Sequence, residues 1–280
     1  MRVAYPSTAF GLADKPAWIT QRLTTWHGIY GPRFDWRKQF PDDRPEAVID
    51  FQNMVHGYWG TILSIDESMG RLIAWLKQTN QIENTIIVFM GDNGLLEGEH
   101  GMVDKRTAHD PSIRIPLIIR GPGIPAGKSI SQQVLTVDIA PSLLELCGAE
   151  PLPGIHGRSW VNLIQNGDSG WRTSWFYHYN YEEQFPYTPN VRAIRTDDWI
   201  YIHYPTGTGG PDQHMAELYD LKNDPEETKN LISSAQHAEQ ILALQDELSW
   251  LMADTGLTAA TAKMPLDKGI KAALPDQQIR

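Results

Sequence analysis

Residues 82–94 read IENTIIVFMGDNG, and at their centre residues 86–90 form a continuous apolar run between polar residues and a glycine. An unbroken apolar run of this length is typical of a strand that is buried on both faces, as in a parallel α/β sheet. A second run, residues 115–119, leads into the turn formed by Gly121, Pro122 and Gly123. We therefore predict an α/β fold in which both runs are strands.

A long helix is predicted on the N-terminal side of the first strand. Pro45 and Glu46 suit the first helical turn, where a missing backbone N–H costs nothing and a negative charge is favoured. Gly70 falls inside this helix and costs up to ~1 kcal/mol relative to alanine, so we expect a neighbouring element to pack closely against it. The apolar residues follow steps of three or four that share one helical face: Met54, Tyr58, Ile62, Ile65, Met69, Leu72 and Leu76.

The composition of the sequence changes after Gly154. Short aromatic-rich runs separated by Asp and Gly turns predict a small antiparallel sheet. These runs are residues 174–179, 191–195, 199–204 and 217–221, and an amphipathic helix follows around residues 241–251. We accordingly divide the chain into an α/β portion at residues 1–154, a small α+β subdomain at residues 155–257, and a tail at residues 258–280.

Composition excludes several classes of function. The chain of 280 residues carries 24 basic and 34 acidic residues, a net charge of −10, which argues against nucleic acid as a partner. No apolar run approaches the ~18 to 20 residues needed to span a bilayer, and the first residues lack a signal-peptide pattern, so we expect no membrane insertion and the sequence assigns no compartment. The single cysteine, Cys147, lies in LLELCGAE and is interpreted as a buried small hydrophobic residue.

The loop at residues 91–106, GDNGLLEGEHGMVDKR, carries the candidate chemistry. Asp92 and Asn93 offer adjacent hard oxygens of the kind that Ca²⁺ or Mg²⁺ prefers. His100, Lys105 and Arg106 add donors for an anion. A metal and cationic donors at one strand end suit a substrate that carries sulfate or phosphate, although Asp-Asn-Gly is also a common turn sequence.

Motifs along most of the chain resemble the sulfatase family of the alkaline phosphatase superfamily. They are MGDNGLLEGEHGMVDKRTAHDPSIRIPLIIRGPG at residues 90–123, DESMGR at 66–71, VDIAPSLLELCG at 137–148, HGRS at 156–159 and ELYDLKNDPEETKNL at 217–231. The DKR sequence after GEHG, WHG at residues 26–28 and FPYTP at residues 185–189 are most similar to N-acetylglucosamine-6-sulfatases and mucin-desulfating sulfatases. The resemblance implies a large mixed α/β domain followed by a small C-terminal antiparallel sheet with a helix.

The resemblance also implies roles for individual residues. Asp92 and Asn93 would provide half of a Ca²⁺ site, with Mg²⁺ as an alternative, and Lys105 would donate to the sulfate or its leaving oxygen. His100 would be a neighbouring catalytic or sulfate contact. The substrate would be a sulfated carbohydrate, with 6-O-sulfated N-acetylglucosamine as the expected sugar.

Three further residues are candidates for substrate binding. Arg106 is either an anion contact or a structural ion-pair partner. Glu182 and Glu183, just before FPYTP, are candidate acceptors for sugar hydroxyls, and an exposed acidic turn is the equally weighted alternative.

The sequence departs from the family pattern at the nucleophile. Sulfatases attack sulfur with a formylglycine made in a C/S-x-P-S-R motif, whereas Cys147 is followed by Gly148, Ala149 and Glu150. The chain therefore resembles the C-terminal half to two-thirds of a sulfatase, and we expect it to be inactive alone. Two alternatives remain open: a non-catalytic remnant that binds a glycan or a partner, and a phosphate or phosphonate ester hydrolase of the same superfamily. The oligomeric state is left open, and full-length relatives are expected to be periplasmic or secreted.

Overall fold

The computed structural model describes residues 12–19, 36, 42–167, 170–183, 188–208, 214–258 and 263–269. The chain divides into two compact units that are both discontinuous in sequence. The first unit comprises residues 1–61, 93–114 and 174–280, and the second comprises residues 62–92 and 115–173. No described helix is long and apolar enough to cross a membrane.

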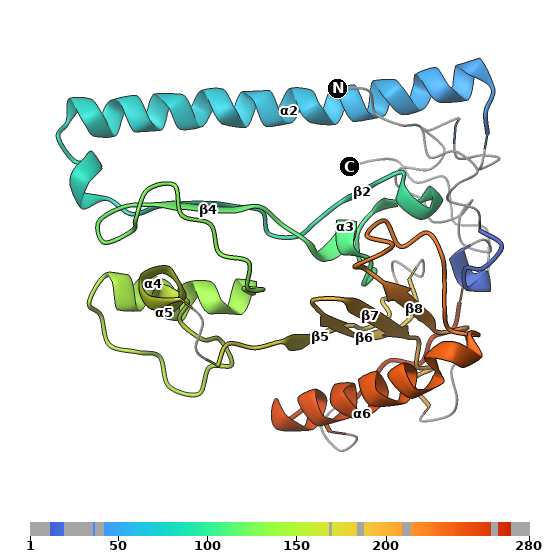
Figure 1. The fold of residues 1–280 in the computed structure, drawn as a ribbon. Helices are drawn as coiled ribbons and strands as arrows, with labels where there is room; N and C mark the ends of the chain where they lie inside the picture. The colour runs from blue at the N-terminus through green and yellow to red at the C-terminus, as the bar shows by residue number, and fades with distance from the viewer. Residues whose placement is uncertain are drawn as a thin grey trace. The chain divides into compact units, whose positions relative to one another are not determined.

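The elements follow one another along the chain as shown in Figure 1. The α-helices are α2 (Pro45–Gln78), α3 (Asp110–Ile113), α4 (Ile139–Leu146), α5 (Val161–Asn166) and α6 (Ala238–Asp254). Short 3-10 helices are η4 (Ile82–Asn84), η5 (Glu99–Gly101), η6 (Thr136–Asp138) and η7 (Ala235–His237). The strands are β1 (Ile87–Met90), β2 (Leu96–Glu97), β3 (Val103–Asp104), β4 (Leu117–Arg120), β5 (Ser174–Tyr179), β6 (Val191–Thr196), β7 (Trp199–His203) and β8 (Glu217–Asp220).

The C-terminal sheet and helix confirm the prediction for this part of the chain. Strands β5, β6, β7 and β8 pair antiparallel in sequence order. Alternate residues of the central strands face opposite sides, because successive side chains of a strand point to opposite faces. Ile194, Tyr201 and Leu218 pack with Leu244 and Leu248 of α6.

The other face of this sheet is buried as well. Val191, Ala193 and Ile202 join a core that includes Trp18 from the N-terminal segment and Leu96 from β2. Both sides of β6 and β7 are therefore covered.

In the second unit β1 and β4 are strands as predicted, but their direction was predicted wrongly. The two strands pair antiparallel, with Ile87 opposite Arg120 and Met90 opposite Leu117. Residues 91–116 carry the chain away from the end of β1 and back to it, so the returning strand runs in the opposite direction. Ile118 is 64% exposed and alternates with partly buried neighbours, so burial on both faces was also wrong.

The helix predicted at residues 45–76 is confirmed as α2, with Pro45 and Glu46 in its first turn. Its burial is not as expected. Phe51 and Val55 are buried beside Trp36, whereas Ile62 is 46% exposed on the predicted apolar face. A Cβ atom at Gly70 would meet nothing within 4 Å, so the close packing expected there is absent among the described residues.

Cys147 is exposed, which corrects the prediction that it is buried. The residue follows α4 directly and forms its C-cap. Gly148, with φ +65°, then takes the left-handed conformation that commonly ends a helix.

Asp138 organises the core of the second unit. Its carboxylate is fully buried and accepts hydrogen bonds from the backbone N–H of Leu135 at 2.7 Å and of Arg158 at 2.8 Å. The guanidinium of Arg172 binds both carboxylate oxygens, with Nη2 2.8 Å from Oδ1. One charged side chain thus ties together segments up to 34 residues apart.

Replacing Asp138 with alanine is expected to destabilise the second unit by about 3 to 5 kcal/mol, because it leaves the Arg172 guanidinium largely buried without its counter-charge. Urea unfolding of the two proteins measures this change. The matched control is Glu145→Ala, an exposed carboxylate on α4, which is expected to change stability by less than about 0.5 kcal/mol. Equal effects of the two substitutions would contradict the role given to Asp138.

Candidate functional site

The segment that carries most of the predicted site residues is ordered around a small hairpin. Strands β2 and β3 pair antiparallel, with Leu96 opposite Asp104 and Glu97 opposite Val103. At its start, the backbone N–H of Gly94 donates to the carbonyl of Ser112 at 3.0 Å. A Cβ atom at Gly94 would lie 2.1 Å from the Pro111 carbonyl oxygen, so this approach requires glycine.

The structure brings together two of the predicted site residues, Asn93 and Lys105. Lys105 Nζ donates to Asn93 Oδ1 at 2.8 Å, and Asn93 Nδ2 donates to the Gly94 carbonyl at 2.8 Å. These contacts fix the orientation of the Asn93 amide. They place a cation beside one of the predicted metal ligands.

Asp92 and Asn93 fit a hard divalent cation by the chemistry of their donors. Asp92 is exposed, and both side chains carry oxygen atoms of the type that a hard cation prefers. Ca²⁺ takes six to eight oxygen ligands. Among the described residues no group of three or more His, Cys, Asp and Glu side chains could hold a metal, so the role of these two residues as metal ligands stays a prediction.

Arg106 and Glu182 also come together, as partners in a polar cluster. Arg106 Nη1 donates to Asp104 Oδ2 at 2.7 Å, and Arg106 Nε lies 3.6 Å from Glu182 Oε1. The hydroxyl of Tyr179 donates to the same Glu182 oxygen at 2.8 Å. The side chain of Arg106 is 24% exposed and that of Glu182 is 42% exposed.

Glu183 does not join this cluster. Its carboxylate is 71% exposed and pairs with Lys268 Nζ at 2.9 Å. The predicted contact of Glu183 with a sugar hydroxyl stays a prediction. Of the motifs used for the finer family placement, residues 26–28 and 185–187 lie outside the described residues.

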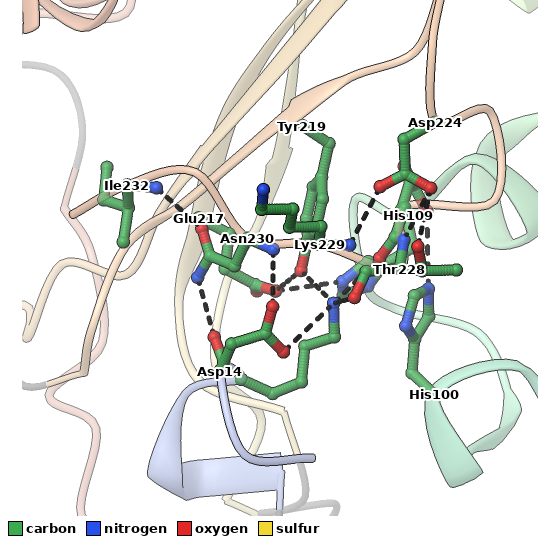
Figure 2. A network of polar contacts seen from close by, with 12 residues as sticks. Asp14, His100, His109, Glu217, Tyr219, Asp224, Thr228, Lys229, Asn230 and Ile232 are labelled. Carbon is green, nitrogen blue, oxygen red and sulfur yellow. Dashed lines mark hydrogen bonds and ion pairs between the residues drawn. The ribbon is translucent and has the colours of Figure 1, made fainter. Parts of the chain in front are cut away.

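His100 lies in a fully buried network rather than at the surface (Figure 2). Its Nε2 atom is 3.5 Å from Glu227 Oε2, and its ring centroid is 4.3 Å from that of His109. Burial, together with the charges of His109 and Lys15, holds the pKa of His100 well below its usual range. A neutral, buried imidazole here is suited to holding structure, and the predicted contact with sulfate stays a prediction.

The buried network itself was not predicted from the sequence. Lys15 Nζ donates to the Tyr219 hydroxyl at 2.9 Å and to the Glu227 carbonyl at 2.8 Å. His109 Nε2 lies 3.3 Å from Glu217 Oε2, and the hydroxyls of Tyr204 and Tyr219 donate to the carboxylate of Glu217. The only signal for it was the ELYDLKNDPEETKNL stretch, which contains Glu217 and Glu227 but does not indicate burial.

The charged groups of this network shift one another's pKa values. Burial alone would lower the pKa of His109, but the carboxylates of Glu217 and Glu227 raise it overall. Burial raises the pKa of Glu227 to about 7, against the opposing effects of His109 and the Asp110 N–H. Glu217 shows the reverse balance: burial opposes its charge, yet His109 and the two tyrosine hydroxyls hold its pKa below the usual value.

Comparison with known proteins identifies the family. The family model described as "Sulfatase" matches residues 13–149, and the model described as "N-sulphoglucosamine sulphohydrolase, C-terminal" matches residues 98–254. The chain therefore belongs to the sulfatase family. This confirms the family resemblance read from the motifs.

Individual relatives agree with this assignment. The chain is 35% identical over 240 residues to an N-acetylglucosamine-6-O-sulfatase of Bacteroides thetaiotaomicron, covering 82% of this chain and 40% of the relative. It is 30% identical over 193 residues to human arylsulfatase K, covering 65% of this chain and 34% of the relative. The chain thus spans well under half the length of these two relatives.

Solved structures share the fold. One of them, determined in complex with its substrate D-glucosamine-2-N,6-O-disulfate, is 32% identical with a TM-score of 0.71 and covers 80% of this chain and 45% of that one. A phosphonate monoester hydrolase of Agrobacterium radiobacter is 28% identical with a TM-score of 0.65 and covers 74% of this chain and 42% of that one. These similarities confirm the α/β fold class with its C-terminal antiparallel sheet and helix.

The stability of Glu227→Gln relative to the wild type is expected to increase as the pH rises from 5 to 8. The folded protein holds the Glu227 proton with a pKa of about 7 against a usual value of 4.5, so the wild type loses stability as pH rises through this window, whereas glutamine does not titrate. The difference in unfolding free energy should grow by roughly 2 to 3 kcal/mol, since one pKa unit corresponds to about 1.4 kcal/mol. Urea unfolding at several pH values measures it.

Other groups also titrate in this range, including Glu97, whose pKa is raised to about 7 by burial and by Glu99. The shift of Glu97 does not depend on Glu227, so its titration cancels in the difference between wild type and variant. The control is Glu226→Gln at the exposed neighbouring position. A difference for Glu227→Gln that does not vary with pH would contradict the raised pKa.

Proposed function

We propose that this chain forms the part of a sulfuric ester hydrolase that binds the sulfate and supplies some of the metal ligands. We propose that its substrate is a sulfated sugar. The observation that carries the proposal is the contact of Lys105 with Asn93 at 2.8 Å, within a chain of the sulfatase family. An ammonium group beside an oxygen that could bind a metal suits an anionic ester. The ammonium group and the metal would both neutralise negative charge on the oxygens of the ester.

The residues take the following roles in this proposal. Asp92 and Asn93 hold Ca²⁺, or Mg²⁺ in its place, and the metal when bound supplies charge neutralisation for the sulfate oxygens. Lys105 donates a hydrogen bond from its ammonium group to the sulfate or to its leaving oxygen. Its contact with Asn93 sets the direction of the ammonium group.

We further propose 6-O-sulfated N-acetylglucosamine as the sugar. Support comes from the relative named N-acetylglucosamine-6-O-sulfatase and from the similar structure that holds a 6-O-sulfated glucosamine. Arg106 and Glu182 are the proposed sugar contacts, since their charged groups lie together and are partly exposed. Glu183 is a weaker candidate because Lys268 occupies its carboxylate.

Hydrolysis would require a nucleophile that these 280 residues do not supply. No C/S-x-P-S-R motif occurs in the sequence, and sulfate esters need an activated nucleophile for attack on sulfur. We therefore propose binding, rather than turnover, as the activity to measure on this chain. The same arrangement could accept a phosphate or phosphonate ester, as the similarity to a phosphonate monoester hydrolase suggests.

Lys105→Ala is expected to weaken binding of N-acetylglucosamine 6-sulfate in the presence of Ca²⁺ by about tenfold or more, because a charge-assisted hydrogen bond contributes roughly 1.5 to 3 kcal/mol. Titration calorimetry or NMR titration measures the dissociation constant. Lys222→Ala, at an exposed lysine of the same unit, is the matched control and should bind like the wild type.

Two further ligands define the specificity. Unsulfated N-acetylglucosamine should bind at least tenfold more weakly than the 6-sulfate, since the same hydrogen bond is lost from the ligand side. N-acetylglucosamine 6-phosphate separates the two anion classes: tighter binding of the phosphate would favour the alternative hydrolase. Equal affinity for sulfated and unsulfated sugar would contradict the proposal.

A further inference from the structure

The two ends of the segment that contains Lys105 meet at one buried carboxylate. We call residues 100–110 the Lys105 loop, and we infer that Glu227 is a positioning residue that holds this loop in the conformation that places Lys105 against Asn93. The inference rests on the proposed function for the meaning of Lys105. Glu227 acts through the loop and is not assigned any contact with substrate.

The contacts of Glu227 define the hold on the loop. At the C-terminal end, the backbone N–H of Asp110 donates to Glu227 at 3.0 Å from Oε1 and 3.2 Å from Oε2. At the N-terminal end, His100 Nε2 lies 3.5 Å from Oε2. Glu227 and His100 are both fully buried, so water does not compete for these contacts.

Glu227 lies in a turn that is stabilised by side-chain hydrogen bonds. Asp224 Oδ1 accepts from the N–H and the hydroxyl of Thr228 at 3.0 and 2.8 Å, and its Oδ2 accepts from the N–H of Lys229 at 2.8 Å (Figure 2). Lys15 Nζ binds the Glu227 carbonyl at 2.8 Å. The Glu227 side chain therefore extends from a hydrogen-bonded turn. In sequence this turn is more than 110 residues away from the loop that Glu227 contacts.

The loop needs such a hold because its backbone is strained around Lys105. Asp104 has φ +88° and Arg106 has φ +80°, and His100 at the start of the loop has φ +53°. Residues with a Cβ atom rarely adopt this conformation, and they keep it only where the surrounding structure enforces it. Two such residues flank Lys105 directly, so the direction of its side chain depends on their conformation.

Hydrogen exchange measured by mass spectrometry tests the inference on the complete chain without any ligand. In Glu227→Ala, we expect backbone amides of residues 100–110 to exchange about tenfold faster or more, while those of α6 change by less than about threefold, because local opening and global unfolding are separate events. Glu226→Ala, one residue away and exposed, should leave both regions unchanged.

Two conservative variants separate positioning from folding. Glu227→Gln keeps an oxygen for the Asp110 N–H and an amide that can donate to neutral His100, so its loop should exchange within about threefold of the wild type. Glu227→Asp is one methylene shorter and cannot reach both ends of the loop, so its loop should exchange at an intermediate rate. If Glu227→Ala does not fold, this graded pair carries the test.

Loop exchange that is unchanged in folded Glu227→Ala, or in Glu227→Asp, would overturn the inference. A uniform increase across the loop and α6 would also overturn it, since Glu227 would then contribute only to global stability. Failure of the wild type to bind a 6-sulfated sugar would overturn the proposed function and leave the exchange result standing.

Discussion

The first unit depends on the pairing of buried polar groups: the carboxylate of Glu217 with His109 and two tyrosine hydroxyls, the carboxyl of Glu227 with the Asp110 N–H, and the ammonium of Lys15 with the Glu227 carbonyl. An unpaired charge in such a place would cost several kcal/mol, so each member constrains where the others can lie. The pairing also spans great distances along the chain: Lys15 and the Glu227 carbonyl are 212 residues apart. It fastens the N-terminal segment and the Lys105 loop to the end of the C-terminal sheet.

Lys105, which has the central role in the proposed chemistry, lies in a loop whose residues Met102 and Ala108 pack in the same core as the C-terminal sheet. The C-terminal sheet is covered on both faces, and the buried network extends its order to residues 100–110, where backbone strain shows that the conformation is imposed from outside. Lys105 can therefore be oriented although it lies in a loop. The second unit has its own organising charge, Asp138, held by Arg172 and backbone N–H groups.

Periodicity predicted what depends on local pattern: α2, α6 and strands β5–β8 lie where the spacing of apolar residues placed them. It did not predict the antiparallel direction of β1 and β4, the exposure of Cys147 or the open space at Gly70, which depend on neighbours brought in from elsewhere. Within the site, Asn93 and Lys105 were predicted and lie together. The role of Glu227 was missed because a hydrogen bond across 117 residues leaves no trace in local spacing.

A double-substitution cycle on Lys105 and Glu227 tests the central claim, that the buried network acts on ligand binding through Lys105. The dissociation constant for N-acetylglucosamine 6-sulfate is measured for the wild type, Lys105→Ala, Glu227→Ala and the double variant, all confirmed as folded. Glu227→Ala should lose about as much affinity as Lys105→Ala, and the double variant should lose little more than either, because coupled residues are not additive. Losses that add in the double variant would contradict the account.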